Sequence, residues 1–427
     1  MVDKKSTQEF HKRWRNAKKS YECTQGAQVL TAPLKIRKDL DYTNVPYVIR
    51  FQDRIRVTPT GIHRPKILVA IGSNGMMYKQ LVKLDDLKGD AVMEQAFEVV
   101  NSMLNREPRT RQRQLHIRTY RVVPLSSQTG VIQWVNNTEP LGHWLYLKRD
   151  NGHARYKSKD EWTFADCNRK MKSVAGRSRQ ERLEAYLDVT NHFKPVFRHY
   201  FLERYPDPSE WFRRRVAYTR SVASNSIVGH ILGIGDRHSL NVLIDSRSAE
   251  VLHIDFGIVF EHGFDLPTPE QVPFRLTRDI VDGMGCTGCE GVFRRCCEET
   301  IRVLRGHVQT ETILTILEVF IADPLYRWTQ TKPELLRRQE RNAKKSEQDE
   351  ESGTDEEMDD NLVVDDDVTS WKRDASHVLT RVRQKLQGQE EPNGEALGVA
   401  GQVSRLLNEA RDKEKLSLMF HGWAAWV

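Results

Sequence analysis

The spacing of apolar residues changes along the chain from a two-residue alternation to a helical repeat. Strand-like runs occupy residues 45–51, 55–60, 66–71 and 76–83. A Gly/Asn turn joins the last two, as in a β-hairpin. From residue 90 to 104 apolar positions recur every three or four residues, which predicts a helix, and mainly helical patterns return at 160–232 and 291–328. We therefore expect an α+β fold with an N-terminal sheet and a larger helical part.

A second hairpin is predicted near the centre of the chain. The apolar runs 242–244 and 251–254 flank the polar stretch DSRSAE, a pattern typical of two strands and a tight turn. Asn241 precedes the first strand and Asp255 follows the second, so the hairpin should bring these two side chains together. They offer the hard oxygen ligands that Mg²⁺ prefers.

Asp236 lies five residues before Asn241, and Asp255 opens a DFG triplet. Protein kinases place a catalytic Asp, a metal-binding Asn and a metal-binding Asp in this order and spacing. Either motif alone occurs readily by chance in a β-rich segment. Both motifs around a predicted hairpin favour phosphoryl transfer, which needs Mg²⁺ and an acceptor for the substrate hydroxyl proton.

The catalytic stretch has the order DRH, with His238 after the Asp, followed by HIDFG. Downstream lie LPTPEQVPFRLTRDIVDGMG at 266–285 and GVFRRCCEETIRVLR at 291–305, and the chain finishes in FHGWAAWV. These stretches resemble the phosphatidylinositol 3-kinase-related protein kinases, most closely their ATM-like (ataxia-telangiectasia mutated) group. The resemblance covers about 45–330 and 395–427, and it implies a two-lobed protein-kinase-like fold with a helical FATC segment.

The resemblance also implies a division of the chain into segments. These are the end of a FAT-like helical region at 1–40, a kinase catalytic domain at 41–330, a charged and partly disordered regulatory linker at 331–394, and FATC at 395–427. Within the catalytic domain, the N-lobe is expected at about 41–135 and the C-lobe at about 136–330. The helical repeats that precede the kinase in the family are not in this sequence, so we expect a fragment or a truncated product.

The family motif assigns roles to particular residues. It implies that Asp236 is the base or orienting group, that His238 contacts the hydroxyl or the transferring charge, and that Asn241 and Asp255 hold Mg²⁺, with Mn²⁺ as an alternative. Lys83 ends a predicted strand and would contact phosphate, paired with Asp90, or else with Asp86 or Glu94. Other expected ATP-binding residues are Pro65 and Lys66 in the phosphate-covering loop, and Tyr120, Trp134 and Val135 around adenine.

The segment after the DFG triplet bears on the substrate. Residues 258–274 contain Glu261, Asp265 and Glu270 and no Lys or Arg, whereas an inositol phosphate headgroup calls for cationic side chains. This favours a protein substrate, and the resemblance implies Ser or Thr followed by Gln (SQ/TQ sites). A phosphoinositide lipid kinase and a catalytically silent module remain as alternatives.

Charge is segregated along the chain. Residues 347–367 hold twelve acidic residues and no basic one, so the other 47 acidic residues face 66 basic residues, a net charge of +19. The acidic tract should be mobile, because like charges repel and little apolar area is available for burial. The basic remainder lacks the interleaved aromatic residues of a nucleic-acid module, so direct nucleic-acid binding is not expected.

Composition limits the remaining classes. No apolar run reaches the roughly 18 residues of a membrane span, and six cysteines in 427 residues do not make a disulfide framework. Cys286, Cys289, Cys296 and Cys297 invite a zinc interpretation, which is disfavoured because adjacent helical residues point about 100° apart.

The resemblance implies a nuclear enzyme of the DNA-damage response and telomere maintenance, with damage-sensor proteins as partners. It also allows a homodimer.

The aromatic residues of the last segment have two interpretations. Phe420, Trp423 and Trp426 could touch a membrane surface or anchor the segment in the kinase domain. We expect burial against the kinase domain.

Overall fold

The computed structural model describes residues 27–34, 43–58, 64–126, 128–321, 368–391 and 394–427. The chain forms two compact units, each described here by itself. The first comprises residues up to Gln95 together with Thr119–Asn136, and the second comprises Ala96–Arg118 and Asn137–Val427.

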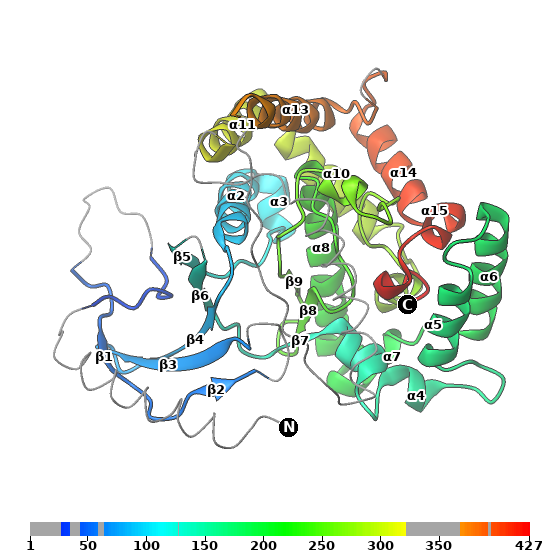
Figure 1. Cartoon of the computed structure of the whole chain (residues 1–427), viewed down its shortest axis with the longest axis horizontal. Coiled ribbons are helices and arrows are strands. Elements are labelled where there is room, and N and C mark those ends of the chain that lie inside the picture. Colours follow the sequence, from blue (N-terminus) through cyan, green and yellow to red (C-terminus); the bar gives the residue numbers. More distant parts are fainter. Residues whose placement is uncertain (1–26, 35–42, 59–63, 127, 322–367, 392–393) are drawn as a thin grey trace. The chain divides into compact units, whose positions relative to one another are not determined.

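An antiparallel sheet forms the first unit (Figure 1). Its strands are β1 (Val48–Phe51), β2 (Arg56–Val57), β3 (Lys66–Gly72), β4 (Met77–Lys83), β5 (Val122–Ser126) and β6 (Thr129–Gln133). They lie in the order β1-β3-β4-β6-β5, with β2 also on β3. The β3–β4 hairpin follows the prediction, and Gly75 at φ 73° supplies the left-handed residue that its turn requires. The predicted strand at 117–125 begins only at Val122.

Helix α2 (Lys88–Arg106) confirms the helical repeat seen in the sequence and crosses the boundary between the units. Its buried positions include Val92, Met93, Ala96 and Phe97. Their spacing of three and four residues turns one apolar stripe toward the interior.

The second unit is mainly helical. Its helices are α3 (Pro108–Gln112), α4 (Gly152–Tyr156), α5 (Phe164–Ser173), α6 (Arg179–His192), α7 (Arg198–Arg204), α8 (Pro208–Ile231), α9 (Arg278–Gly283), α10 (Val292–Leu304), α11 (His307–Ile321), α13 (Val368–Gln387), α14 (Val399–Ala410) and α15 (Lys413–Ser417). Short helices η1 (His143–Leu147), η2 (His262–Asp265) and η3 (His421–Trp423) and the sheet β7 (Thr138–Pro140), β8 (Val242–Asp245) and β9 (Val251–His253) complete it.

Helix α8 runs through the middle of this unit and packs against α10 (Figure 1). Pro208 begins the helix at a position where a missing N–H costs nothing, and Asp207 caps it by accepting from the Glu210 N–H. From Tyr218 onward nearly every residue is buried, as in a helix surrounded on all sides. The C-terminal half of α8 therefore gives the following loop a rigid base.

The last segment of the chain is built into the second unit. Trp423 and Trp426 are buried, and Phe420 is half-buried. Arg275 donates to the carbonyl oxygens of Trp423 at 2.7 Å and of Ala424 at 3.0 Å. The predicted anchoring against the kinase domain is confirmed for the two tryptophans.

Other predictions differ from the structure or concern residues that it does not describe. Helix was expected for 1–40, yet residues 27–34 contain no helix, and Gln28 instead forms an isolated bridge with Tyr47. The rest of that segment, residues 61–63 of the loop at 61–67 and the acidic tract at 347–367 lie outside the described residues. Among the described residues, no helix is long and apolar enough to cross a membrane.

Replacing Arg275 tests how firmly the last segment is held. Arg275 is almost fully buried and also donates to the Val427 oxygen at 3.3 Å. Arg275→Ala would leave buried carbonyl groups without donors, and should lower the free energy of unfolding by about 3–5 kcal/mol. Urea unfolding followed by tryptophan fluorescence measures the loss. Arg213→Ala is the control, because that side chain is 72% exposed and should change stability by less than about 0.5 kcal/mol.

Candidate active site

The loop after α8 places Asp236 and Asn241 in fixed positions. Asp236 has a left-handed backbone, with φ 57°, which is uncommon for a residue other than glycine. The Asn241 side-chain amide donates to the Asp236 carbonyl oxygen at 3.0 Å, and the Asn241 backbone N–H donates to the His238 carbonyl at 2.9 Å. These bonds close the loop into a compact turn.

The predicted hairpin is confirmed. Strands β8 and β9 pair antiparallel with Val242 opposite His253. The ladder continues one step further, because the Ile254 N–H donates to the Asn241 carbonyl at 3.0 Å. Asn241 and Asp255 therefore lie at the same end of the hairpin.

His238 lies inside the same loop and is buried. Its Nδ1 accepts a hydrogen bond from the Leu240 N–H at 3.2 Å. With Nδ1 acting as an acceptor, Nε2 carries the proton of the neutral ring. His238 can thus present a donor to an oxygen atom.

Arg237 was not predicted as a site residue, and the structure gives it a central place. Its buried guanidinium donates to the carbonyl oxygens of Gly235 and Ile254, both at 2.8 Å, and to that of Asp255. It also lies 5.3 Å from the centre of the Phe256 ring. Arg237 therefore ties the loop of Asp236 to the DFG triplet, a role that its place in the DRH motif could have indicated.

Glu270 also has a role that its sequence position did not reveal. One carboxyl oxygen accepts the Asp236 N–H at 2.8 Å. Burial and the nearby Asp236 charge raise the pKa of Glu270 to about 7, against the lowering effect of the Asp236 N–H and Arg237. The carboxyl group of Glu270 thus belongs to the interior of the site.

Glu261 is likewise not a free surface charge. It pairs with Lys385 at 2.7 Å and with Arg381 at 3.1 Å, both from α13. Burial alone would raise the pKa of Glu261, but the two cations lower it to about 2. Of the three acidic residues counted in 258–274, Asp265 keeps a largely exposed side chain, at 63%. Glu261 and Glu270 are therefore engaged within the unit, which reduces the negative charge that this segment presents to a substrate.

The oxygen atoms at the hairpin end suit a divalent ion whose remaining ligands come from nucleotide phosphates and water. Asn241 supplies an amide oxygen and Asp255 a carboxylate. Among the described residues, no group of three or more His, Cys, Asp or Glu side chains could hold a metal alone. Mg²⁺ is commonly bound by one or two protein oxygens plus substrate phosphates and water, which suits this pair.

The first unit carries the other predicted ATP-binding residues. Lys83 ends β4 as predicted and forms an ion pair with Asp85 at 2.6 Å, a partner that was not among those expected. Asp90 and Glu94 are both buried in α2. Glu94 accepts the Tyr120 N–H at 2.8 Å, so this helix carboxylate and Tyr120 are held together.

Trp134 follows β6 and is half-buried. The Trp134 backbone N–H donates to the Lys79 carbonyl at 3.0 Å, and the Lys79 ammonium lies 3.9 Å from the centre of the Trp134 ring. This contact holds the Trp134 ring beside β4. Val135 comes next and is half-buried.

Pro65 and Lys66 lie at the start of β3. Pro65 is buried, and its carbonyl accepts the Thr58 N–H at 2.9 Å, which closes the base of the loop. Lys66 is paired opposite Val82 of β4. These contacts fix where the loop leaves the sheet.

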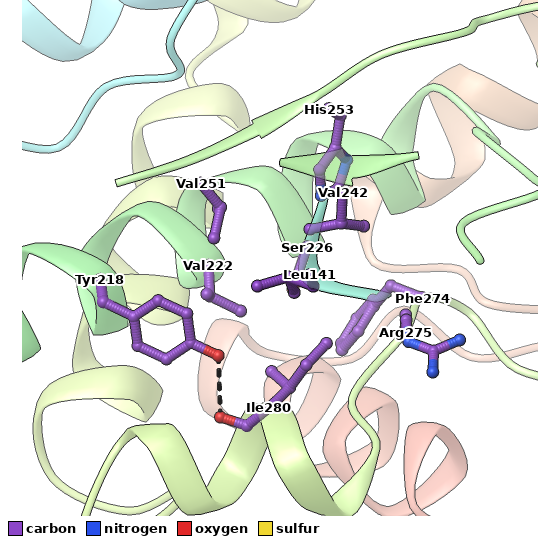
Figure 2. Close-up of a pocket in the computed structure, with 10 residues that line it drawn as sticks. All are labelled: Leu141, Tyr218, Val222, Ser226, Val242, Val251, His253, Phe274, Arg275 and Ile280. Atoms are coloured by element: carbon purple, nitrogen blue, oxygen red, sulfur yellow. Dashed lines mark hydrogen bonds between the residues drawn. The ribbon is translucent and has the colours of Figure 1, made fainter. Parts of the chain in front are cut away.

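A cavity of about 20 Å³ lies beside the catalytic hairpin (Figure 2). Its lining includes Val242 and Val251 of the hairpin and Tyr218, whose hydroxyl donates to the Ile280 carbonyl at 3.0 Å. His253 also lines it, and burial lowers the pKa of this ring to about 3. The volume suits about one water molecule, so the cavity is an internal packing feature and none of the predicted site residues borders it.

Comparison with known families decides the relationship. Residues 77–330, more than half of the chain, match the family described as phosphatidylinositol 3- and 4-kinase, and residues 396–427 match the FATC domain. The chain belongs to the phosphatidylinositol 3- and 4-kinase family. The resemblance seen in the sequence and the predicted kinase fold are thereby confirmed.

Several relatives within this family are similar over most of the chain. Serine-protein kinase ATM of Sus scrofa is 46% identical over 93% of this chain, and serine/threonine-protein kinase ATM of Arabidopsis thaliana is 44% identical over 93%. Serine/threonine-protein kinase tel1 of Schizosaccharomyces pombe is 43% identical over 94%. The alignments cover only 13%, 10% and 14% of those proteins, so the chain spans a small part of their length.

Solved structures of CtTel1 are similar to this chain in fold and in sequence. The FAT and kinase domain of CtTel1 has a TM-score of 0.78 and 38% identity, covering 93% of this chain and 25% of that one. The complete CtTel1 dimer with C2 symmetry gives the same TM-score and identity, and 13% of its chain is covered.

The ion pairs of Glu261 should make the free energy of unfolding depend on pH in the acid range. The folded pKa of about 2 lies below the ordinary value of 4.5, so the stabilisation is complete above pH 5 and is lost as the pH falls toward 2. Glu261→Gln should lower the free energy of unfolding at pH 7 by about 2 kcal/mol and flatten its decline between pH 5 and 3. Urea titrations across this range provide the measurement.

Asp265→Asn serves as the control for that experiment, since its exposed carboxylate lies in the same segment. It should leave the pH profile of the wild type unchanged. An acid dependence that is identical in Glu261→Gln and the wild type would contradict the assignment of the depressed pKa.

Proposed function

We propose that this chain is the catalytic portion of a serine/threonine protein kinase that transfers the γ-phosphate of ATP to Ser or Thr residues followed by Gln. The observation that carries the proposal is the joint placement of Asp236, Asn241 and Asp255. The turn, the hairpin and the Arg237 contacts hold these three residues together on one unit. Family membership and relatives named as serine/threonine-protein kinases support the same activity.

Each residue of the catalytic loop then has a task. Asp236 accepts or orients the proton of the substrate hydroxyl. The Nε2–H of His238 donates a hydrogen bond to the hydroxyl or to a phosphoryl oxygen, because Nδ1 already accepts from Leu240. Charge spreads over the γ-phosphoryl oxygens in the transition state, so a fixed donor of this kind lowers the barrier.

The residues proposed to bind the nucleotide and its metal ion follow the family motif. Asn241 and Asp255 would hold Mg²⁺ or Mn²⁺, which supplies positive charge to the phosphates when bound. Lys83, with an acidic partner, and the loop base at Pro65 and Lys66 would contact the phosphates. Adenine would be bound by Tyr120, which precedes β5, and by Trp134 and Val135, which follow β6. Asp85 forms an ion pair with Lys83 in this structure, and Asp90, Asp86 and Glu94 remain the candidate partners from the family motif.

The lack of cationic side chains in the segment after the DFG triplet favours a protein substrate over a lipid. Residues 258–274 contain no Lys or Arg, and a headgroup with several phosphates needs such side chains. The acidic residues contribute less than the sequence implied, since Glu261 is neutralised by α13 and Glu270 faces the catalytic loop. A phosphoinositide lipid kinase therefore remains the alternative that the substrate experiment tests.

The wider role is proposed from the relatives. The resemblance to the ATM-like group, supported by relatives named ATM and tel1, leads us to propose a nuclear kinase in the DNA-damage response and telomere maintenance, recruited by damage-sensor proteins. The CtTel1 structure is a dimer with C2 symmetry, which supports a homodimer for a protein that contains this chain. Direct binding of nucleic acid by this portion is not part of the proposal.

Substrate class is tested by labelled ATP and Mg²⁺ with SQ and TQ peptides, matched SA and TA peptides in which Ala replaces Gln, and phosphoinositide vesicles. We expect label on SQ and TQ peptides, reduced when Gln is replaced by Ala, and negligible label on lipid. Peptides with a neutral hydroxyl approach Asp236 without the desolvation that a phosphorylated headgroup demands. Transfer to lipid with SQ peptides untouched would restore the lipid-kinase alternative, and no transfer to either would indicate a silent module.

Two substitutions separate metal binding from proton handling. Asp255→Ala should weaken Mg·ATP binding, because a metal ligand is lost. Asp236→Ala should leave Mg·ATP binding unchanged and lower turnover by roughly 10²- to 10⁴-fold, the usual effect of a positioned base. Isothermal titration with a non-hydrolysable ATP analogue and steady-state kinetics give the two numbers. Equal nucleotide affinity in the wild type and Asp255→Ala would refute the metal role.

A further inference from the structure

The backbone of Asp236 is held from both sides by side chains. Its N–H donates to Glu270 at 2.8 Å, and its carbonyl oxygen accepts from the Asn241 amide at 3.0 Å. A left-handed backbone at a residue with a side chain is strained and persists only where its surroundings enforce it. The two bonds are contacts of the kind that can enforce it.

Glu270 reaches this N–H through a space that two glycines leave open. A Cβ atom at Gly235 would lie 2.7 Å from the second carboxyl oxygen of Glu270, and one at Gly263 would lie 2.6 Å from it. The Glu270 N–H also donates to the Gly263 carbonyl at 2.9 Å. Backbone and side chain together fix where the carboxyl group sits.

The position of Glu270 connects three segments of the second unit. It lies in the segment after the DFG triplet, it contacts the loop of Asp236, and the next residue, Gln271, donates its N–H to the Met419 sulfur at 3.3 Å. The last segment of the chain and the catalytic loop are therefore joined through residues 270 and 271.

We propose that Glu270 is a positioning residue that sets the backbone of Asp236 through the N–H···Oε1 bond, and thereby aims the Asp236 carboxylate at the substrate hydroxyl. The inference rests on the proposed phosphotransferase function. It assigns Glu270 no contact with ATP or with the substrate. A displacement of about 1 Å at a reacting group can cost 10²-fold in rate, so loss of this bond should appear in kcat.

Four variants of the full chain test the inference. Glu270→Ala removes the acceptor, and Glu270→Gln keeps an amide oxygen that accepts the same N–H. Gly263→Ala retains Glu270 but crowds its carboxyl group. Gln271→Ala is the matched control, because its side-chain amide donates to the Pro269 carbonyl on the surface.

We expect Glu270→Ala to lower kcat for SQ peptide by roughly 10²-fold, with the KM for ATP and the melting temperature close to wild type. Glu270→Gln should restore kcat to within about tenfold of wild type, a rescue that general destabilisation would not produce. Gly263→Ala should lower kcat in the same direction as Glu270→Ala. Gln271→Ala should match the wild type.

Hydrogen exchange gives a readout that does not require activity. Amide exchange in peptides covering 232–241 should be faster in Glu270→Ala than in the wild type, and near the wild-type rate in Glu270→Gln. If the wild type transfers no phosphate, the proposed function fails while these exchange rates still test the positioning bond.

Three results would overturn the inference. Wild-type kcat and exchange in Glu270→Ala would show that the bond is dispensable. A kcat as low in Glu270→Gln as in Glu270→Ala, with undisturbed exchange in Glu270→Gln, would assign the carboxylate a direct chemical role. A loss of kcat that follows a fall in melting temperature in all the Glu270 and Gly263 variants would indicate a structural effect alone.

Discussion

Asp236 and Asp255 both have left-handed backbones, at φ 57° and 64°, and this is the constraint on which the candidate site depends. Such conformations cost about 1–3 kcal/mol each when the residue is not glycine. The surrounding bonds offset that cost: Arg237 donates to the Asp255 carbonyl, and Glu270 and Asn241 hold the peptide groups of Asp236. The buried half of α8 and the β8–β9 hairpin supply the rigid frame for these bonds.

Local patterns were sufficient to predict much of this frame. The β8–β9 hairpin, the β3–β4 hairpin and helix α2 each follow from the periodicity of their own residues. Asn241 and Asp255 were expected at one end of a hairpin, and the bond from Ile254 to Asn241 places them there. These features depend on neighbours in sequence, so the sequence shows them directly.

Contacts between distant segments could not be predicted in the same way. Glu261 looked like a surface charge because its cations, Arg381 and Lys385, lie about 120 residues later in the chain. Glu270 looked similar, although it accepts a hydrogen bond from a residue 34 positions earlier. Counting charges along a segment cannot distinguish a solvated carboxylate from one that is neutralised by another element.

The segment after the DFG triplet runs beside the catalytic loop and is bonded to it at three successive points. Gly235 donates to Ile258, and the N–H groups of Phe260 and Glu261 donate to the carbonyls of Leu232 and Gly233, all at 3.0 Å. A Cβ at Gly233 would come within 2.4 Å of the Glu261 nitrogen, so the approach is too close for any side chain. Residues 232–235 and 258–261 therefore behave as one mechanical part. A displacement of either segment would therefore carry the other with it, so the segment after the DFG triplet cannot shift without moving the base of the Asp236 loop.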